Sequence, residues 1–383
     1  MPIDADAMLT AAKDQTGLTD LGDDRIFEGL DILVRSLNEE AKLTERGVAS
    51  TAQRITQSIA NRLRVVDYLK QHPRLAERPV REPIFVFGLP RTGTTLVINL
   101  LAVDPANRAF LRWESLESVP PVQKGQLSTD PRCIAEQERL NLSLKYAPHI
   151  SAMHHEDADS PSECQFSMAA SFCAQLFDSN AHIPAYHDWL LHKADYRPAF
   201  DYHKSLLQVL QEHEGGRWVL KNPWHPLFLD ALTGVYPDAR LVMTHRDPAE
   251  AVGSACSLAA NVRMMMSDDV NPRDVADTLL ETFDLMIARQ DAYRAQHGQD
   301  SIHDILYTDM LRDPIGEMRK LYARFDMPFT AEALAAMESF LANNQQGKHG
   351  KHSYRLEDYG LTKESVRRHF REYCERYDIA LKA

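Results

Sequence analysis

An apolar segment that runs into a glycine-containing loop, residues 83–96, constrains the fold more than any other feature of the chain. The apolar half is typical of a short buried strand. In the loop, Gly88, Gly93 and Thr95 have the spacing of the phosphate-binding pattern G-x-x-x-x-G-K-[ST], but Thr94 stands in place of the lysine that reaches the β- and γ-phosphates of a nucleotide. Backbone N–H groups and a helix N-terminus still bind an anion. The sequence therefore predicts a phosphate loop that differs from that of an ATPase.

Short apolar segments and helical segments alternate along the chain after this loop. Three of the apolar segments are further predicted strands: 218–220, 241–243 and 304–307. The alternation is typical of an α/β fold in which helices flank a parallel sheet. Because ligands bind beyond the carboxyl ends of such strands, we expect the loop to lie close to Lys221 and Arg246, which follow two of them.

The chain is predicted to consist of a helical accessory segment, residues 1–78, and a main domain, residues 79–383. The accessory segment has apolar residues at three- and four-residue spacing, which indicates amphipathic helices. It carries no recognisable chemistry and is a candidate surface for a homodimer. Within the main domain, residues of about 110–215 are rich in His and aromatic side chains and have little strand pattern, so we expect a helical insertion over the sheet.

The composition argues against several classes of partner. The 383 residues carry a formal net charge of −12, which disfavours nucleic acid or an anionic membrane as the main partner. The five cysteines form no C-x-x-C pair, which suits reduced thiols and disfavours zinc. Adjacent His154 and His155 cannot both face one ion from a helix, so no metal is expected. We find no targeting signal and no transmembrane run, and we expect a cytoplasmic chain without stable membrane insertion.

Two further stretches carry candidate site residues. Pro248 suits the first turn of a helix, so Arg246 before it and Ser254 about two turns into it can hold one phosphate from two sides. The alternative is an Arg that caps the helix and a Ser packed within it. Lys221 either neutralises charge on a transferring group or is a surface lysine. His225, four residues later, is either a base or a structural histidine.

In this order and spacing, the three stretches resemble the sulfotransferases that use 3′-phosphoadenosine 5′-phosphosulfate (PAPS). Residues 90–95 resemble the family's 5′-phosphosulfate loop. Arg246 and Ser254 resemble its 3′-phosphate motif, and Lys221 its lysine near the bridging oxygen of the sulfate. Arg91 in place of the loop lysine is similar to tyrosylprotein sulfotransferases and to a bacterial group. Three further blocks resemble that bacterial group: 111–114, 347–352 and 356–360.

The resemblance covers nearly the full chain and implies a P-loop-NTPase-like sulfotransferase fold, with PAPS as co-substrate and no metal. It also implies a set of residues that contact PAPS: Arg91, Thr92, Gly93, Thr94, Thr95, Arg246, Ser254, Tyr307 near the adenine, and Lys348 in a late basic loop. Core packing is the alternative for Tyr307, and a solvated basic face is the alternative for Lys348.

The implied reaction is the transfer of a sulfuryl group from PAPS to a hydroxyl or amine of a small acceptor. Such a transfer requires positioning, cationic stabilisation and a base for the acceptor proton. Glu114 is the predicted base, because tyrosylprotein sulfotransferases have a Glu in a similar place. His225 is the second candidate, and an exposed acid beside a helix is the alternative for Glu114. Arg91 and Lys221 are predicted to stabilise charge on the sulfuryl group and the leaving phosphate.

The acceptor pocket is expected from residues 110–200, including Glu163, and from residues 258–270. Within the second range, residues 262–266 are either an adaptable lid or part of a core helix. No pattern in these ranges specifies the acceptor. Two other functions stay open at this point: a divergent P-loop kinase or NTPase, and a non-catalytic nucleotide-binding protein.

Overall fold

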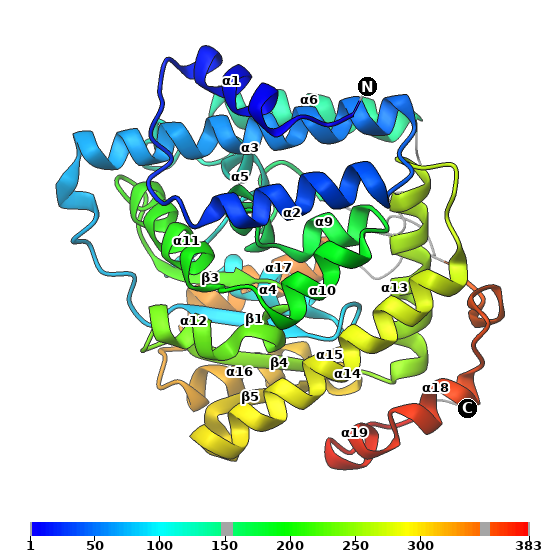
Figure 1. The fold of residues 1–383 in the computed structure, drawn as a ribbon. Helices are drawn as coiled ribbons and strands as arrows, with labels where there is room; N and C mark the ends of the chain where they lie inside the picture. Colours follow the sequence, from blue (N-terminus) through cyan, green and yellow to red (C-terminus); the bar gives the residue numbers. More distant parts are fainter. Residues whose placement is uncertain (1, 147–155, 345–352, 382–383) are drawn as a thin grey trace.

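The computed structural model describes residues 2–146, 156–344 and 353–381. At its centre, five strands form one sheet in the order β2-β3-β1-β4-β5, and every neighbouring pair is parallel (Figure 1). The strands are β1 (Ile84–Gly88), β2 (Asn107–Ala109), β3 (Arg217–Lys221), β4 (Arg240–His245) and β5 (Ile302–Leu306). The predicted α/β fold with a parallel sheet flanked by helices is confirmed.

The structure differs from the predicted strands by one or two residues at their ends and by one additional strand. Strand β2 was not predicted, because three residues at a sheet edge give too short an apolar pattern to recognise. The last strand ends at Leu306, one residue before its predicted end, because Tyr307 begins helix α15 (Tyr307–Arg312). Tyr307 therefore stands at the carboxyl edge of the sheet.

Helices pack on both faces of the sheet, and the side chains of β1 alternate between two hydrophobic cores. Phe85 and Phe87 belong to one core, and Ile84 and Val86 belong to the other. The second core is closed by α4 (Thr94–Ala102), α16 (Pro314–Arg324) and α17 (Ala331–Asn343). The first is closed by helices from both halves of the chain: α8 (Gln165–Met168), α10 (Pro184–His192), α11 (Arg197–Leu210), α12 (Leu229–Val235), α13 (Pro248–Met264), α14 (Pro272–His297), α18 (Lys363–His369) and α19 (Arg371–Arg376).

The N-terminal helices share that first core. They are α1 (Ala5–Thr16), α2 (Ile26–Glu39) and α3 (Glu45–Gln71), which lie across the top of the molecule in Figure 1. The predicted apolar stripes are buried at Leu30 and Leu33 and at Ile59 and Leu63. At Gly47 a Cβ atom would lie 2.1 Å from the carbonyl oxygen of Met266, so the start of α3 contacts the chain just after α13. The division of the chain at residue 78 stays a prediction.

No helix among the described residues has both the length and the apolar run needed to cross a bilayer. The cytoplasmic location and the homodimer stay predictions.

Candidate active site

The loop between β1 and α4 is shaped by two glycines. At Gly88 (φ +151°) a Cβ atom would lie 2.4 Å from the carbonyl oxygen of Thr244, and at Gly93 (φ +101°) one would lie 2.6 Å from the ring of Tyr307. Helix α4 then begins without a side-chain cap. Among the described residues, the backbone N–H groups of Gly93, Thr94 and Thr95 have no acceptor. They form an open anion site at a helix N-terminus.

Arg91 brings positive charge to this site. Its Nε donates to the hydroxyl of Ser254 at 3.0 Å, and Arg246 Nη1 donates to the Arg91 carbonyl oxygen at 3.0 Å. Burial, followed by the charge of Arg246, lowers the pKa of Arg91. The Arg246 guanidinium lies 4.6 Å from the centre of the Tyr307 ring. The structure thus brings together four of the predicted PAPS contacts, and two neighbouring guanidinium groups favour an anionic ligand.

Thr92 does not line the cavity that holds the other residues of the loop. Its side chain is fully buried, and its hydroxyl donates to the carbonyl of Leu89 and pairs with the hydroxyl of Thr244, both at 2.7 Å. Its own N–H also donates to Leu89. Thr92 therefore anchors the loop to β4, and we no longer propose it as a ligand contact. Ser254 is likewise outside the cavity wall and acts on the site through Arg91.

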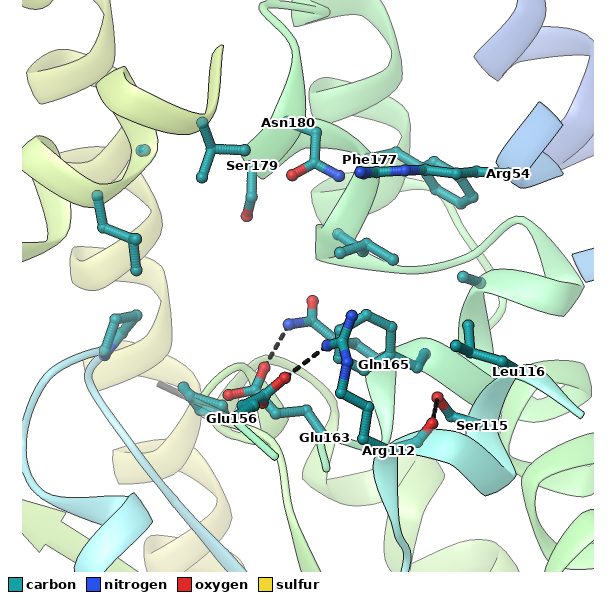
Figure 2. Close-up of a pocket in the computed structure, with 18 of the residues that line it drawn as sticks. Arg54, Arg112, Ser115, Leu116, Glu156, Glu163, Gln165, Phe177, Ser179 and Asn180 are labelled. Atoms are coloured by element: carbon teal, nitrogen blue, oxygen red, sulfur yellow. Dashed lines mark hydrogen bonds and ion pairs between the residues drawn. The ribbon is translucent and has the colours of Figure 1, made fainter. Parts of the chain in front are cut away.

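A cavity of about 1340 Å³ extends from the loop to the N-terminal helices. The donor end is lined by Pro90, Arg91, Gly93, Thr94, Thr95, Arg246 and Tyr307. The opposite end is lined by α3, α5 (Arg112–Leu116), α6 (Pro131–Tyr146), α9 (Gln175–Asn180) and the end of α13, part of which is drawn in Figure 2. The contribution of α3 was missed, because its polar residues, among them Arg46, Arg54 and Arg64, read as a solvated helix face.

Lys221 and Glu163 form an ion pair beside this cavity, whose wall includes Glu163 but not Lys221. Lys221 Nζ lies 3.2 Å from Glu163 Oε1, and both side chains are nearly buried. The backbone holds them together, since the N–H of Cys164 donates to the Lys221 carbonyl at 2.8 Å. Glu163 lines the cavity, as predicted, and Gln165 donates to its other oxygen (Figure 2). The pairing could not be read from the sequence, because it depends on a segment that lies beside the end of β3.

Comparison with known proteins identifies the family of this fold and site. A profile of the sulfotransferase family matches residues 83–332. The chain belongs to the sulfotransferase family. It is 34% identical to the sulfotransferase STF9 of Mycobacterium avium, whose crystal structure superposes with a TM-score of 0.93 and covers 100% of this chain and 98% of that one.

Two more relatives agree with this assignment. The crystal structure of sulfotransferase STF1 from Mycobacterium tuberculosis is 30% identical, with a TM-score of 0.86, over 96% of this chain and 98% of that one. The Mycobacterium bovis omega-hydroxy-beta-dihydromenaquinone-9 sulfotransferase Stf3 is 24% identical over 327 residues, which is 79% of this chain and 77% of that protein. The predicted resemblance is confirmed, and the sulfotransferase assignment extends beyond the phosphate loop.

Glu114, the base predicted for this sulfotransferase, lies outside the cavity wall. It is fully buried and forms an ion pair with Arg108, and it accepts the N–H of Leu111 at 3.2 Å. Burial raises the pKa of its carboxyl group, which the Arg108 guanidinium partly offsets. These contacts are those of a structural ion pair that caps α5, so we no longer propose Glu114 as the base.

His225 is enclosed in the core below the sheet edge. Its ring packs 5.3 Å from that of Phe85 and 5.7 Å from that of Phe200, and among the described residues neither ring nitrogen has a partner. Burial lowers the pKa of His225 well below its usual value. It does not line the cavity. His225 is therefore a structural histidine, and we no longer propose it as a base.

The enclosed histidines predict a loss of stability in mild acid. Burial holds the pKa of His225 far below 6.5 and lowers that of His203 to about 3. Below pH 6.5 these histidines bind protons in the unfolded chain but stay neutral in the folded chain. The free energy of unfolding should therefore fall by up to about 1.4 kcal/mol per pH unit for each histidine. Urea unfolding between pH 7.5 and 5.5 measures this slope. The variant His225→Leu should make this slope less steep. The control His192→Gln, at an exposed position, should leave the slope unchanged. Equal slopes for the two variants would contradict the assignment of His225 as a buried, neutral histidine.

The remaining predicted positions have different outcomes. Lys348, His154 and His155 lie outside the described residues. Tyr354, which follows the late basic loop, donates to the Glu250 carbonyl at 2.9 Å, close to Arg246. Within the described residues, no group of three His, Cys, Asp or Glu could hold a metal ion. The stretch 262–266 ends α13, and Val262, Arg263, Met265 and Met266 line the cavity.

Proposed function

We propose that this sulfotransferase transfers a sulfuryl group from PAPS to a hydroxyl, or an amine, of a small acceptor bound in the 1340 Å³ cavity. One observation carries the proposal. The start of α4, Arg91 and Arg246 line one cavity together with Glu163, and Lys221 pairs with Glu163 beside it. An anion site alone would suit many proteins, but an anion site beside a paired carboxylate and ammonium suits group transfer to an acceptor that must lose a proton.

Glu163 takes the role of general base in this proposal. Its carboxylate lines the cavity, whereas Glu114 and His225 do not. As the acceptor oxygen forms its bond to sulfur, the acceptor proton passes to Glu163. The bond between sulfur and the bridging oxygen breaks, and its electron pair stays on the departing 3′-phosphoadenosine 5′-phosphate. Lys221 and Arg91 stabilise the charge on that phosphate and on the sulfuryl group.

The residues present fit the donor. The N–H groups of Gly93, Thr94 and Thr95, which have no acceptor in the described part of the chain, suit the 5′-phosphosulfate. Arg246, held by Glu250 at 2.6 Å, suits the 3′-phosphate. They fit a triphosphate with Mg²⁺ less well. Thr94 replaces the lysine of the loop, and β4 ends in His245, whose ring is bound by Asp304 and Tyr373 at 2.8 Å each. This disfavours a kinase or an NTPase.

The acceptor is proposed only as a class. The relative Stf3 is named for a hydroxylated dihydromenaquinone. In this chain the cavity wall combines apolar side chains such as Leu116, Phe166 and Phe177 with polar ones, which suits an acceptor with an apolar body and a polar end.

Donor binding is the first test of the proposal. Titration with 3′-phosphoadenosine 5′-phosphate is expected to raise the melting temperature saturably, whereas ATP with Mg²⁺ should have little effect. Arg246→Gln should weaken that binding by about 10- to 100-fold, because a charge-assisted contact is lost. Arg35→Gln is the matched control, since Arg35 is exposed on α2 and does not line the cavity. Preferential binding of ATP with Mg²⁺ would favour the NTPase alternative. Donor binding without any turnover across acceptors would favour the non-catalytic one.

A further inference from the structure

The cavity carries an excess of positive charge that the donor site does not explain. Among the described residues, nine arginines but only five acidic side chains line it, although the whole chain has a formal net charge of −12. Arg91 and Arg246 stand at the donor end. A second group of guanidinium ions stands at the opposite end, on three different helices: Arg54 on α3, Arg112 on α5 and Arg139 on α6.

Two members of the second group are neutralised within the protein. Arg112 pairs with Glu136 at 3.0 Å and with Glu156 at 2.5 Å. Arg139 pairs with Glu136 at 2.6 Å. These ion pairs hold the wall of the cavity in place, and their charges are largely balanced.

Arg54 is different, because no partner within residues 2–146, 156–344 and 353–381 neutralises it. Among the described residues its guanidinium has no ion pair and no hydrogen bond, and the residues outside the described ranges include no Asp or Glu in the sequence. Arg54 is an exposed residue of α3 that lines the open cavity, so its guanidinium is accessible to a ligand. In Figure 2 its side chain lies on the same side of the cavity as Phe177 and Asn180, across from Glu163 and Gln165.

We propose that Arg54 binds an anionic group, a carboxylate, phosphate or sulfate, that the acceptor carries away from the hydroxyl to be sulfated. The inference rests on the proposed function, because it assigns the end of the cavity opposite the donor to the acceptor. Arg54, Arg112 and Arg139 carry three positive charges, and Glu136 and Glu156 balance two of them, so an anion would balance the third. The planar fork of Arg suits a carboxylate or a phosphate. The acceptor class is thus an amphipathic anion: a hydroxyl near Glu163, an apolar body along Phe166 and Phe177, and a charged end at Arg54.

Arg54 belongs to the acceptor rather than to the donor nucleotide. Arg91 follows β1 in the phosphate loop and Arg246 follows β4, whereas Arg54 is on α3. In Figure 2 Arg54 lies across the cavity from Glu163, which pairs with Lys221.

The experiment compares matched charged and neutral probes by isothermal titration calorimetry, with the donor site filled by 3′-phosphoadenosine 5′-phosphate. The probes are 4-phenylbutyrate, the corresponding phenylalkyl phosphate and sulfonate, and the neutral 4-phenylbutyramide. At least one anion is expected to bind about 10- to 100-fold more tightly than the amide. This preference should disappear in Arg54→Gln, be partly retained in Arg54→Lys, and stay unchanged in the control Arg35→Gln.

Three results would overturn the inference. The first is equal binding of the anions and the amide, which includes no binding of any of them. The second is a preference for the anions that persists in Arg54→Gln. The third is loss of 3′-phosphoadenosine 5′-phosphate binding in Arg54→Gln, which would assign Arg54 to the donor site. If the proposed function is wrong, 3′-phosphoadenosine 5′-phosphate will not bind the wild-type protein. In that case the affinities of the anionic and neutral probes are compared without the nucleotide, so the two failures can be told apart. Arg54→Gln is expected to melt no lower than the wild type, because it removes a cation that pairs with none of the described residues. Misfolding should therefore not obscure the result.

Discussion

Replacing Glu163 with glutamine is expected to lower kcat by about 10²- to 10⁴-fold, because the amide cannot accept the acceptor proton. The volume and the contact with Lys221 are nearly conserved by this change, and the donor contacts at Arg91 and Arg246 are left in place. Binding of 3′-phosphoadenosine 5′-phosphate should therefore be retained. The measurement is release of this nucleotide from PAPS with a panel of phenol and alcohol acceptors, alongside its dissociation constant.

The matched control is Glu138→Gln, the same chemical change at an exposed position of α6 that does not line the cavity. It should leave turnover unchanged. If Glu163→Gln retained full kcat, the base would have to be sought elsewhere on the cavity wall, and the proposed role of the Lys221–Glu163 pair would be wrong.

Replacing Glu114 with alanine is expected to lower the free energy of unfolding by about 3–5 kcal/mol, since it leaves Arg108 buried without its partner. Glu114 is fully buried, and the Arg108 side chain is only 2% exposed. The capping contact to the N–H of Leu111 is lost in the same step. Urea unfolding at pH 7.5 measures the effect, and the nucleotide affinity of the fraction that stays folded should be close to that of the wild type.

A double variant separates the structural role of Glu114 from a catalytic one. Replacing Glu114 and Arg108 together with Leu and Met should recover much of the lost stability, because a buried ion pair is often exchanged for apolar side chains at little cost. Glu114→Gln should then retain turnover. A stable Glu114→Gln variant that has lost kcat would restore the original prediction of Glu114 as the base.

Local patterns in the sequence were enough to predict the fold and the residues that lie at the donor end of the cavity. The predicted strand and loop of residues 83–96 are present, because Gly88 and Gly93 are required where the backbone contacts Thr244 and the Tyr307 ring. Lys221 and Arg246 were found at the carboxyl edge because the ends of parallel strands meet there. Positions that are fixed by backbone geometry can be read from a short segment.

The chemistry of the predicted acid and base residues could not be read in the same way. Glu114 and Glu163 are both carboxylates in the region expected to form the acceptor pocket. One is enclosed by Arg108, and the other faces the cavity beside Lys221. No local pattern distinguishes them, because burial and partners come from segments that are distant in the chain. The same holds for His225, which the rings of Phe85 and Phe200 enclose.

The sequence by itself determined the α/β fold, the phosphate loop and the cations that follow the strands, because these depend on spacing within single segments. Only the tertiary structure decided which carboxylate meets Lys221, and only the packing of α3 placed Arg54 on the cavity wall. The polar face of α3 has the pattern of any solvated helix. It becomes part of the cavity wall because the other face of α3 is buried in the core that it shares with the sheet, which leaves Arg46, Arg54 and Arg64 on the side of the cavity.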